Sequence, residues 1–593
     1  MFQSFTETAS PDQGPPRLAA LRAVMRAEGL DGFIIPRADA HQGEYVAERD
    51  SRLAWLTGFT GSAGYCVALR DRAGVFVDGR YRVQVRSQVA DVFTPVDWPE
   101  MSLGQWITDS LSTGSVVGFD PWLHTVSQIR ELETAVGDIA LRRSANLVDR
   151  IWEDQPPPPA TPAFAQPVDL AGESHEAKID RLAGQITPAA TAVLTLPDSI
   201  CWLLNIRGDD VPRTPFVQGF ALLHASGEVT FFVDPAKLDG LGDHLGPKVR
   251  VLPVGAFLPA LTALEGPVQI DPHSCPMIVA DALRDAGIEI IEAQDPCALP
   301  KACKTRAELD GARAAHLRDG AAMVRFLCWL DNQPVGSLTE IDVVRRLEAE
   351  RAATNALRDI SFDTISGAGP NGAIVHYRVT EQTNRSVDAG LLLVDSGGQY
   401  VDGTTDITRT ILVGSVGAEE RRAFTLVLKG MIAISRLRWP KGLAGRDMDA
   451  LARVALWEHG LDYGHGTGHG VGSYLSVHEG PQRLARTGTV PFMPGMILSN
   501  EPGFYREGAF GIRIENLVVV EEAPALPGQT VPEMLRFETL THAPIDTRLI
   551  DTGLLTAAER DWLNTYHAEV LARIGPLVDG GPAAWLAEAC API

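Results

Sequence analysis

The chain has 593 residues, which at about 100–200 residues per domain predicts three or four domains. It carries 75 acidic and 52 basic side chains, a formal net charge of −23, so the basic surface that nucleic-acid and anionic-membrane binding require is not expected. Hydrophobic residues make up 45% of the chain, enough for ordinary buried cores and far from a disordered composition.

The cysteines and the first residues both favour a cytoplasmic protein. The 7 cysteines are odd in number and unclustered, which is typical of reduced thiols and not of a disulfide framework or a zinc ribbon. The stretch before Arg17 has no basic residue and no apolar core, unlike a secretory signal. No charge-free apolar stretch reaches about 18 residues, so no membrane span is expected.

The first predicted domain covers residues 1–155. Leu18, Leu21 and Met25 recur at helical spacing, and a strand-like run, Gly32–Pro36, follows. A second strand is predicted at Val75–Asp78. The domain ends in a linker, because the four consecutive prolines in DQPPPPATPAFAQP (154–167) exclude a helix or a central strand.

The second predicted domain, residues 168–302, resembles a weak copy of the first. Asp198-Ser199 before Trp202 repeats Asp50-Ser51 before Trp55, and FFVD repeats VFVD. Two α/β domains related by duplication are therefore predicted, although ordinary α/β segments can also resemble each other by chance.

Helices alternate with strands in the third predicted domain, residues 303–530, which indicates an α+β class. Its helices are predicted at 305–330, 339–353, 418–438 and 447–459, with strands and turns at 360–413 and 463–522. Residues 531–593 are predicted to form a helical extension of this domain, with helices near 556–574 and 582–590.

Two aspartates flank a turn in the third domain. Asp395 ends the apolar strand that begins at Leu391, and Asp406 starts the β-branched run to Val413. Asp402-Gly403 between them is a strong turn signal, so both carboxylates are expected on neighbouring antiparallel strands. Two such aspartates alone are more often edge or solvent residues than metal ligands.

Three histidines follow in HGTGHGVGSYLSVHEGP, residues 465–481. His465 and His469 are four apart and share a face, and His478 lies nine residues further on. The intervening glycines argue against a helix and allow close approach of the backbone. A lone histidine is usually structural, but three within this stretch predict a site.

Two glutamates complete the pattern. Glu501 stands where a strand stops at Pro502-Gly503, and Glu515 follows Arg513 by two residues in a strand with apolar neighbours. A charged residue in such a strand needs a partner.

Together these positions supply four carboxylates and one imidazole: Asp395, Asp406, His469, Glu501 and Glu515. Four buried negative charges require cations, and two divalent ions neutralise them formally. Oxygen-rich ligands with one histidine suit manganese, with zinc or cobalt as alternatives. Two such ions can activate water and polarise a carbonyl, so the predicted chemistry is hydrolysis.

Five stretches resemble the metal-dependent pita-bread peptidases, and among them the three-domain cytosolic Xaa-Pro aminopeptidases (aminopeptidase P). They are AIVHYR (373–378), VDSGGQYVDGTTDITRT (394–410), HGTGHGVGSYLSVHEGP (465–481), SNEPGFY (499–505) and GIRIEN (511–516). The resemblance covers nearly the whole chain, and the five ligand positions carry over without a substitution. It implies two creatinase-like N-terminal α/β domains, a pita-bread catalytic domain and a homodimer.

The resemblance also implies the reaction and the roles. The substrates would be peptides with N-terminal Xaa-Pro, whose bond lacks an amide N–H and which ordinary peptidases cleave poorly. Glu501 would shuttle the proton, His376 and His478 would stabilise the oxyanion, and His465 would line the proline pocket. Arg513 would either steady the ligand carboxylates or form a plain structural ion pair. Tyr377 and Tyr505 are expected only to pack.

Two alternatives remain open. A prolidase shares the metal pattern and cleaves Xaa-Pro dipeptides, although the two preceding domains and the HGTGHGVG…HEGP form favour the aminopeptidase. A pita-bread binding module without metals is the alternative from another class, and such modules lack the ligands that are all present here.

Overall fold

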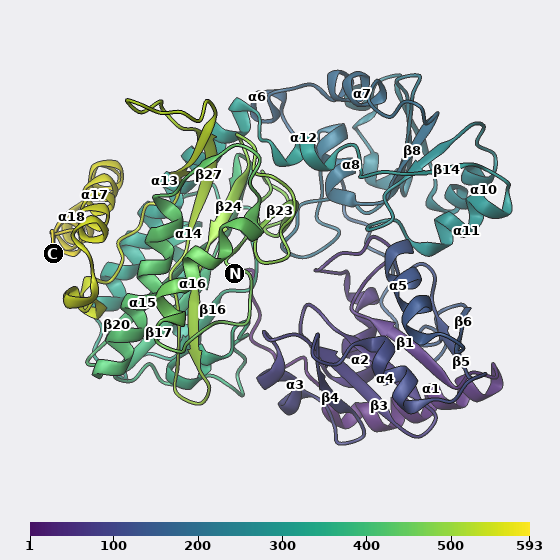
Figure 1. Ribbon diagram of the computed structural model, residues 1–593, viewed down its shortest axis with the longest axis horizontal. Helices are drawn as coiled ribbons and strands as arrows, with labels where there is room; N and C mark the ends of the chain where they lie inside the picture. The colour runs from purple at the N-terminus through teal and green to yellow at the C-terminus, as the bar shows by residue number, and fades with distance from the viewer. The chain divides into compact units, whose positions relative to one another are not determined.

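The computed structural model describes residues 1–593 and divides the chain into two compact units (Figure 1). One unit, the N-terminal unit, comprises Thr8–Val168 and Glu173–Ala298. The other, the C-terminal unit, comprises Leu299–Ile593 together with two short pieces, Met1–Glu7 and Asp169–Gly172. The first seven residues, predicted to lie in the first domain, therefore pack with the last half of the chain.

The N-terminal unit holds two six-stranded sheets of the same design. The first has the order β4-β3-β2-β1-β5-β6 and the second β12-β11-β10-β8-β13-β14. Read in this order, the five neighbouring pairs of each sheet are parallel, antiparallel, antiparallel, parallel and parallel. Two α/β domains of one design confirm the predicted α/β class of this half.

The elements of the N-terminal unit alternate in sequence. The strands of the first sheet are β1 (Gly32–Pro36), β2 (Tyr65–Leu69), β3 (Ala73–Val77), β4 (Thr94–Asp97), β5 (Val116–Phe119) and β6 (Ala140–Arg143). Those of the second are β8 (Thr191–Leu194), β10 (Phe220–His224), β11 (Val229–Phe232), β12 (Val249–Leu252), β13 (Val268–Ile270) and β14 (Ile290–Glu292). The main helices are α1 (Gly14–Ala27), α2 (Arg52–Thr57), α3 (Arg82–Gln88), α4 (Leu103–Ser110), α5 (Val126–Val136), α7 (His175–Ala183), α8 (Pro197–Leu204), α10 (Phe257–Thr262) and α11 (Met277–Asp285).

The proline-rich linker has no helix, as its composition predicts. Residues 155–163 have no regular structure, and the short strand β7 (Phe164–Ala165) then pairs with β9 (Ile206–Arg207). The chain enters the C-terminal unit through α6 (Val168–Ala171), leaves it after Gly172, and returns through α12 (Ala298–Ala302).

Three helices of the C-terminal unit begin at side-chain caps. Thr305 starts α13 (Arg306–Asp331) and Thr339 starts α14 (Glu340–Ala352), each in a capping box that satisfies otherwise unpaired backbone N–H groups. Thr556 caps α17 (Ala557–Ile574) in the same way. The remaining helices are α15 (Ala418–Ser435), α16 (Asp449–Trp457) and α18 (Gly580–Ala589).

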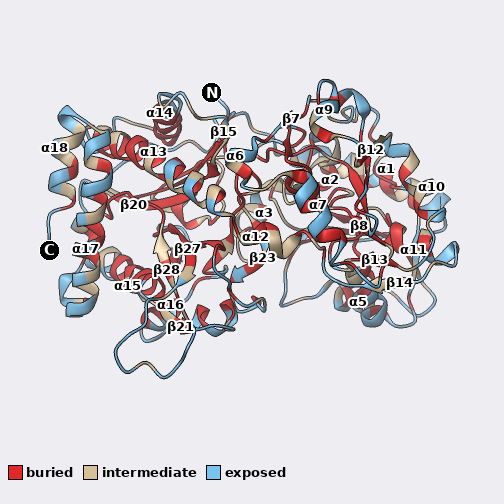
Figure 2. Ribbon diagram, turned by 90° about the horizontal axis from the view of Figure 1, so that it is seen from above, coloured by how far each residue is buried: buried red, intermediate tan, exposed pale blue.

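One six-stranded sheet, two three-stranded sheets and one two-stranded sheet form the strand layer of this unit. The orders are β16-β17-β20, β21-β28-β27-β24-β22-β23, β15-β18-β19 and β25-β26. The bounds are β15 (Asp359–Ile360), β16 (Ile365–Ala368), β17 (Gly390–Ser396), β18 (Gly398–Tyr400), β19 (Gly403–Thr404), β20 (Ile407–Val413), β21 (Arg438–Pro440), β22 (Gly468–Gly470), β23 (Glu479–Leu484), β24 (Ile497–Asn500), β25 (Gly503–Arg506), β26 (Phe510–Arg513), β27 (Asn516–Glu522) and β28 (Met534–Thr539). Their interior is buried, whereas the outer faces of α17 and α18 are exposed (Figure 2).

The segment from residue 531 was predicted to be helical, but it begins with strand β28, which pairs with β27. Leu535 and Phe537 are buried there at a spacing of two, the period of a half-buried strand. The helices α17 and α18 follow as predicted. None of the helices has the length and apolar character that crossing a membrane requires.

Candidate metal centre

Two of the carboxylates come from the sheet β16-β17-β20. Asp395 lies in β17, and Asp406 immediately precedes β20, its antiparallel neighbour. Ser396 pairs with Ile407, so both aspartates lie at one end of the ladder, as the sequence predicts. Between them the chain forms the separate hairpin β18–β19.

The other predicted ligands come from the larger sheet. His469 lies in β22, Glu501 directly follows β24, and Glu515 links β26 to β27. The two sheets are joined at this point, since the backbone N–H of Glu515 donates to the carbonyl of Thr408.

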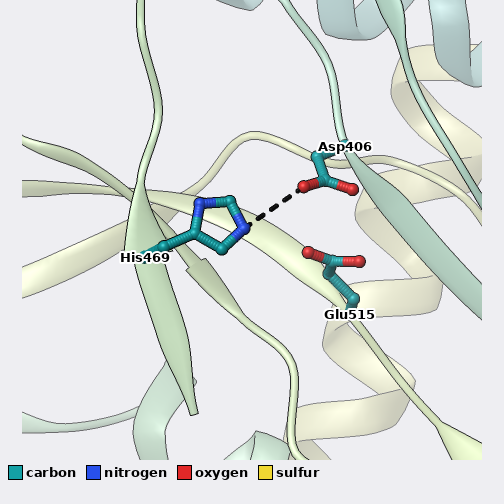
Figure 3. Close-up of side chains that lie close together, drawn as sticks. All are labelled: Asp406, His469 and Glu515. Carbon is teal, nitrogen blue, oxygen red and sulfur yellow. Dashed lines mark ion pairs between the residues drawn. The ribbon is translucent and has the colours of Figure 1, made fainter. Parts of the chain in front are cut away.

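The side chains converge (Figure 3). The ligand atoms of Asp406, His469 and Glu515 all lie within 4.8 Å of one another. His469 Nε2 is 3.4 Å from Asp406 Oδ2 and 3.5 Å from Glu501 Oε1. Asp395 is held beside this group through Arg513, whose Nε also lies 4.0 Å from Glu501 Oε2.

The orientation of His469 suits a metal ligand. Its Nδ1 lies 2.9 Å from the carbonyl oxygen of Gly470, which can only accept a hydrogen bond. In the neutral ring Nδ1 therefore carries the hydrogen, and the lone pair of Nε2 points at the carboxylates of Asp406 and Glu501. A lone pair facing carboxylate oxygens is stabilised by a cation between them.

The electrostatics also require cations. Burial, followed by the charge of Asp395, raises the pKa of Asp406 to about 8. Burial also raises the pKa of Glu501 to about 6, and burial with the neighbouring carboxylates holds that of Glu515 well above its ordinary value. These carboxyls therefore favour protons unless another positive charge is present.

Two buried carboxylate oxygens, Asp395 Oδ1 and Glu515 Oε1, have no hydrogen-bond partner. Buried polar atoms are normally paired, and an unpaired carboxylate oxygen is the donor that hard divalent cations take. The donor set thus fits two divalent metal ions, which Asp395, Asp406, His469, Glu501 and Glu515 could hold.

A buried arginine connects the carboxylates to a histidine. Arg513 donates to Asp395 Oδ2 at 2.5 Å and to the hydroxyl of Tyr505 at 2.6 Å. The Tyr505 hydroxyl lies 2.9 Å from His465 Nε2, and His465 Nδ1 lies 2.8 Å from the Gly466 carbonyl. Because that carbonyl only accepts, the neutral His465 ring receives its second hydrogen bond from Tyr505.

The expectation that Tyr505 only packs is therefore wrong. In the β25–β26 hairpin Gly503 pairs with Arg513, and Tyr505 shares the face of Gly503. The missing side chain of Gly503 leaves room, because a Cβ there would lie 2.6 Å from the Tyr505 hydroxyl. Tyr377 is also more than a packing residue, since its hydroxyl donates to Glu340 at 2.9 Å.

The two remaining histidines of the prediction, His376 and His478, are half-buried. The ring of His478 packs edge-on against His469 with centroids 4.2 Å apart. His376 follows the short helix η5 (Gly369–Ala373), which packs against β17 and β26, the strands that carry Asp395 and Arg513. His478 thus contacts a candidate metal ligand directly, whereas His376 follows a short helix that packs on the strands of Asp395 and Arg513.

The loop that carries His465 and His469 is held by a network that the sequence did not indicate. Arg453 donates to the carbonyl oxygens of His465 and Tyr463, and its guanidinium pairs with Asp449 at 2.7 Å. Thr467 also donates to Asp449 at 2.6 Å. These contacts fix the backbone on both sides of His465.

Glu479, the residue after His478, is held by buried ion pairs with two lysines. Its carboxylate lies 3.0 Å from Lys301 Nζ and 2.6 Å from Lys304 Nζ, and all three side chains are buried. No local pattern signals this cluster, because the partners are about 175 residues apart in the chain.

Fold and site together define a metal-dependent peptidase. Its carboxylate-rich centre lies in a pita-bread domain, which follows two creatinase-like domains in the chain. Residues 310–522 match metallopeptidase family M24, and residues 533–593 match the C-terminal region of that family. Residues 17–151 and 154–308 match creatinase/prolidase N-terminal domains.

Curated relatives show which kind of M24 peptidase the chain resembles. A probable Xaa-Pro aminopeptidase P of Coccidioides posadasii is 39% identical over 95% of this chain and 91% of its own. Aminopeptidase P2 of Arabidopsis thaliana is 38% identical over 93% of this chain and 84% of its own. The chain therefore belongs to metallopeptidase family M24 and groups there with the three-domain Xaa-Pro aminopeptidases.

Solved structures agree with this assignment. The X-prolyl aminopeptidase of Caenorhabditis elegans, described as a cytosolic enzyme with a di-nuclear active site, matches with a TM-score of 0.92 at 33% identity, over 98% of this chain and 100% of its own. A prolidase from Pyrococcus horikoshii matches 63% of this chain and 99% of its own with a TM-score of 0.50 at 21% identity, a likeness of fold alone.

Proposed function

We propose that this metallo-aminopeptidase releases the N-terminal residue from peptides whose second residue is proline. The observation that carries the proposal is a group of three buried carboxylates, the half-buried Glu501 and one oriented imidazole, in a chain that aligns with Xaa-Pro aminopeptidases over almost its full length. The proposal includes a homodimer in the cytoplasm, because the chain resembles the three-domain cytosolic Xaa-Pro aminopeptidases.

The proposed centre holds two divalent metal ions, manganese by preference because the donors are mostly carboxylate oxygens. Asp395, Asp406, His469, Glu501 and Glu515 would hold them. When bound, the ions supply an activated water and polarise the scissile carbonyl. The free oxygens Asp395 Oδ1 and Glu515 Oε1 support this ligand set.

Glu501 is proposed to hold and move the proton. Its Oε1 lies 3.5 Å from His469 Nε2, among the proposed metal ligands, so its carboxylate would stand next to the activated water. Its Oε1 accepts a hydrogen bond from Ser499 at 3.1 Å, which orients the carboxylate towards the other ligands. The leaving proline nitrogen would take up the proton that Glu501 carries.

The half-buried histidines are proposed to bind the substrate. His376 and His478 would donate hydrogen bonds to the scissile carbonyl oxygen, whose negative charge develops in the transition state. His465 would line the proline-side pocket, with Tyr505 and Arg513 holding its ring. An imidazole held in this way presents its carbon edge to an apolar ring without losing a hydrogen bond.

A metal analysis followed by a substrate panel tests the proposal. The purified protein is freed of metal, reloaded with manganese, zinc or cobalt, and assayed on Arg-Pro-Pro tripeptides beside Xaa-Pro dipeptides. We expect two metal ions per chain, highest activity with manganese, and preference for the tripeptide. Cleavage of dipeptides alone would replace the proposal by a prolidase, and absence of metal uptake would replace it by a binding module.

A further inference from the structure

A strap of seven residues, Met1–Glu7, belongs to the C-terminal unit, although Thr8–Val168, which follow it, belong to the other unit. Gln3 anchors it, because its side-chain amide donates to the carbonyl of Thr364 at 3.2 Å and accepts from the N–H of Thr364 at 2.8 Å. The N–H of Phe2 donates to the buried carboxylate of Glu348 at 2.7 Å.

The strap then binds the segment that carries His376. This segment, residues 374–389, contains no helix or strand. The carbonyl of Phe5 accepts from the N–H of Glu381 at 2.8 Å. Arg378 donates to the carbonyl oxygens of Ser4 at 3.0 Å and Thr6 at 3.2 Å. The strap thus satisfies one backbone N–H of this segment and binds the guanidinium of Arg378.

Phe5 fills the core beneath the same segment. It is 7% exposed and belongs to a cluster that includes Tyr377 and Leu393, with Ile374 and Tyr505 packed against it. Ile374 and Tyr377 flank His376, Leu393 lies two residues before Asp395 on the same strand face, and Tyr505 is bonded to His465. The cluster that contains Phe5 therefore reaches residues next to His376, Asp395 and His465.

We infer that the strap is a positioning element for His376: residues Gln3 to Thr6 hold the segment on which this histidine stands. A segment without secondary structure depends on side-chain and loop contacts for its position, and the strap contributes a buried aromatic ring and hydrogen bonds to Arg378 and Glu381, which follow His376. The inference rests on the proposed role of His376 in the reaction.

The first test compares two phenylalanines of the strap. Phe5→Ala removes the buried ring, and Phe2→Ala removes one that is 41% exposed and serves as the matched control. We expect Phe5→Ala to lower kcat by about 10–100-fold, since a displacement of about 1 Å in a catalytic group costs on the order of 100-fold. KM should change by less than about 3-fold, because an oxyanion donor acts in the transition state. Metal content should equal that of the wild type in both variants.

The second test asks whether the strap acts through His376. The Phe5→Ala change and deletion of residues 2–7 are each combined with His376→Ala, which by itself should lower kcat by about 100–1,000-fold. In that background the strap changes should lower kcat by less than about 3-fold further, because residues that act as a unit are not additive.

The outcomes separate the inference from the proposed function. If His376→Ala lowers kcat and the strap changes lower it by the same factor in both backgrounds, the strap does not act through His376 and the inference is wrong. Wild-type kcat in His376→Ala would overturn the role of His376 and the inference together. If Phe5→Ala does not fold, Gln3→Ala, which removes the hydrogen bonds to Thr364 without opening a large cavity, must show the same non-additivity.

Discussion

Replacing Arg513 by lysine separates the charge of this residue from its shape. The guanidinium of Arg513 bonds Asp395, Tyr505 and, at 3.2 Å, Thr408, and it is 2% exposed. Lysine keeps the positive charge, so its Coulomb repulsion of bound metal is nearly unchanged. It offers a single ammonium, which cannot reproduce the planar fork that holds three oxygens at once.

The expected loss follows from those contacts. Arg513→Lys leaves at least one of the buried oxygens of Asp395 and Tyr505 without its partner, at a cost of about 1–3 kcal/mol. Residues that orient metal ligands typically contribute a factor of about 10–100 to metal affinity. A factor of that size corresponds to about 1.4–2.7 kcal/mol, which agrees with the loss of one or two buried hydrogen bonds.

Calorimetric titration of manganese into metal-free protein measures the affinity, and kcat at saturating metal measures the chemistry. Arg506→Lys is the matched control, because Arg506 lies on the paired strand β25 and forms an exposed ion pair with Glu419. That pair should contribute no more than about 1 kcal/mol to stability and nothing to metal binding. Wild-type affinity and kcat in Arg513→Lys would show that Arg513 forms only a structural ion pair.

Three further predictions concern the metal centre. Asp406→Asn should remove at least one metal ion and abolish turnover, as measured by metal analysis and peptide release; full activity at sub-micromolar manganese would contradict the ligand assignment. His478→Ala should lower kcat by about 100–1,000-fold with unchanged metal content, and loss of metal would instead make His478 a ligand. Burial raises the pKa of Asp406 to about 8 and that of Glu501 to about 6 in the metal-free protein. The folded protein therefore retains protons that the unfolded chain releases near pH 4. Its free energy of unfolding should accordingly fall as pH rises from about 4 to about 8. Metal ions replace those protons, so the difference in Tm between metal-loaded and metal-free protein should widen from about pH 5 to about pH 8, and a constant difference would refute this account.

Local sequence determined most of the elements and indicated the candidate ligand residues. Helix α13 runs from Arg306 to Asp331, close to the predicted 305–330, because its apolar spacing and its Thr305 cap are both local features. The two aspartates at the ends of paired strands follow equally from an apolar run and a turn. The convergence of Asp406, His469 and Glu515 could be expected, because clustered carboxylates with one histidine need cations to balance their negative charge.

Only the tertiary structure decided how these residues are supported. The sequence alone predicts that Tyr505 only packs. The register of β25 against β26 instead brings its hydroxyl next to Arg513. The strap bond from Gln3 to Thr364 joins residues 361 positions apart, and the bond from Lys304 to Glu479 joins residues 175 positions apart, so no local sequence pattern predicts either contact. A chain cut near Lys301 would accordingly lose Met1–Glu7 as well as the N-terminal unit. Ligand types follow from chemistry that is local in sequence, whereas their positions depend on contacts that form only when distant segments pack together.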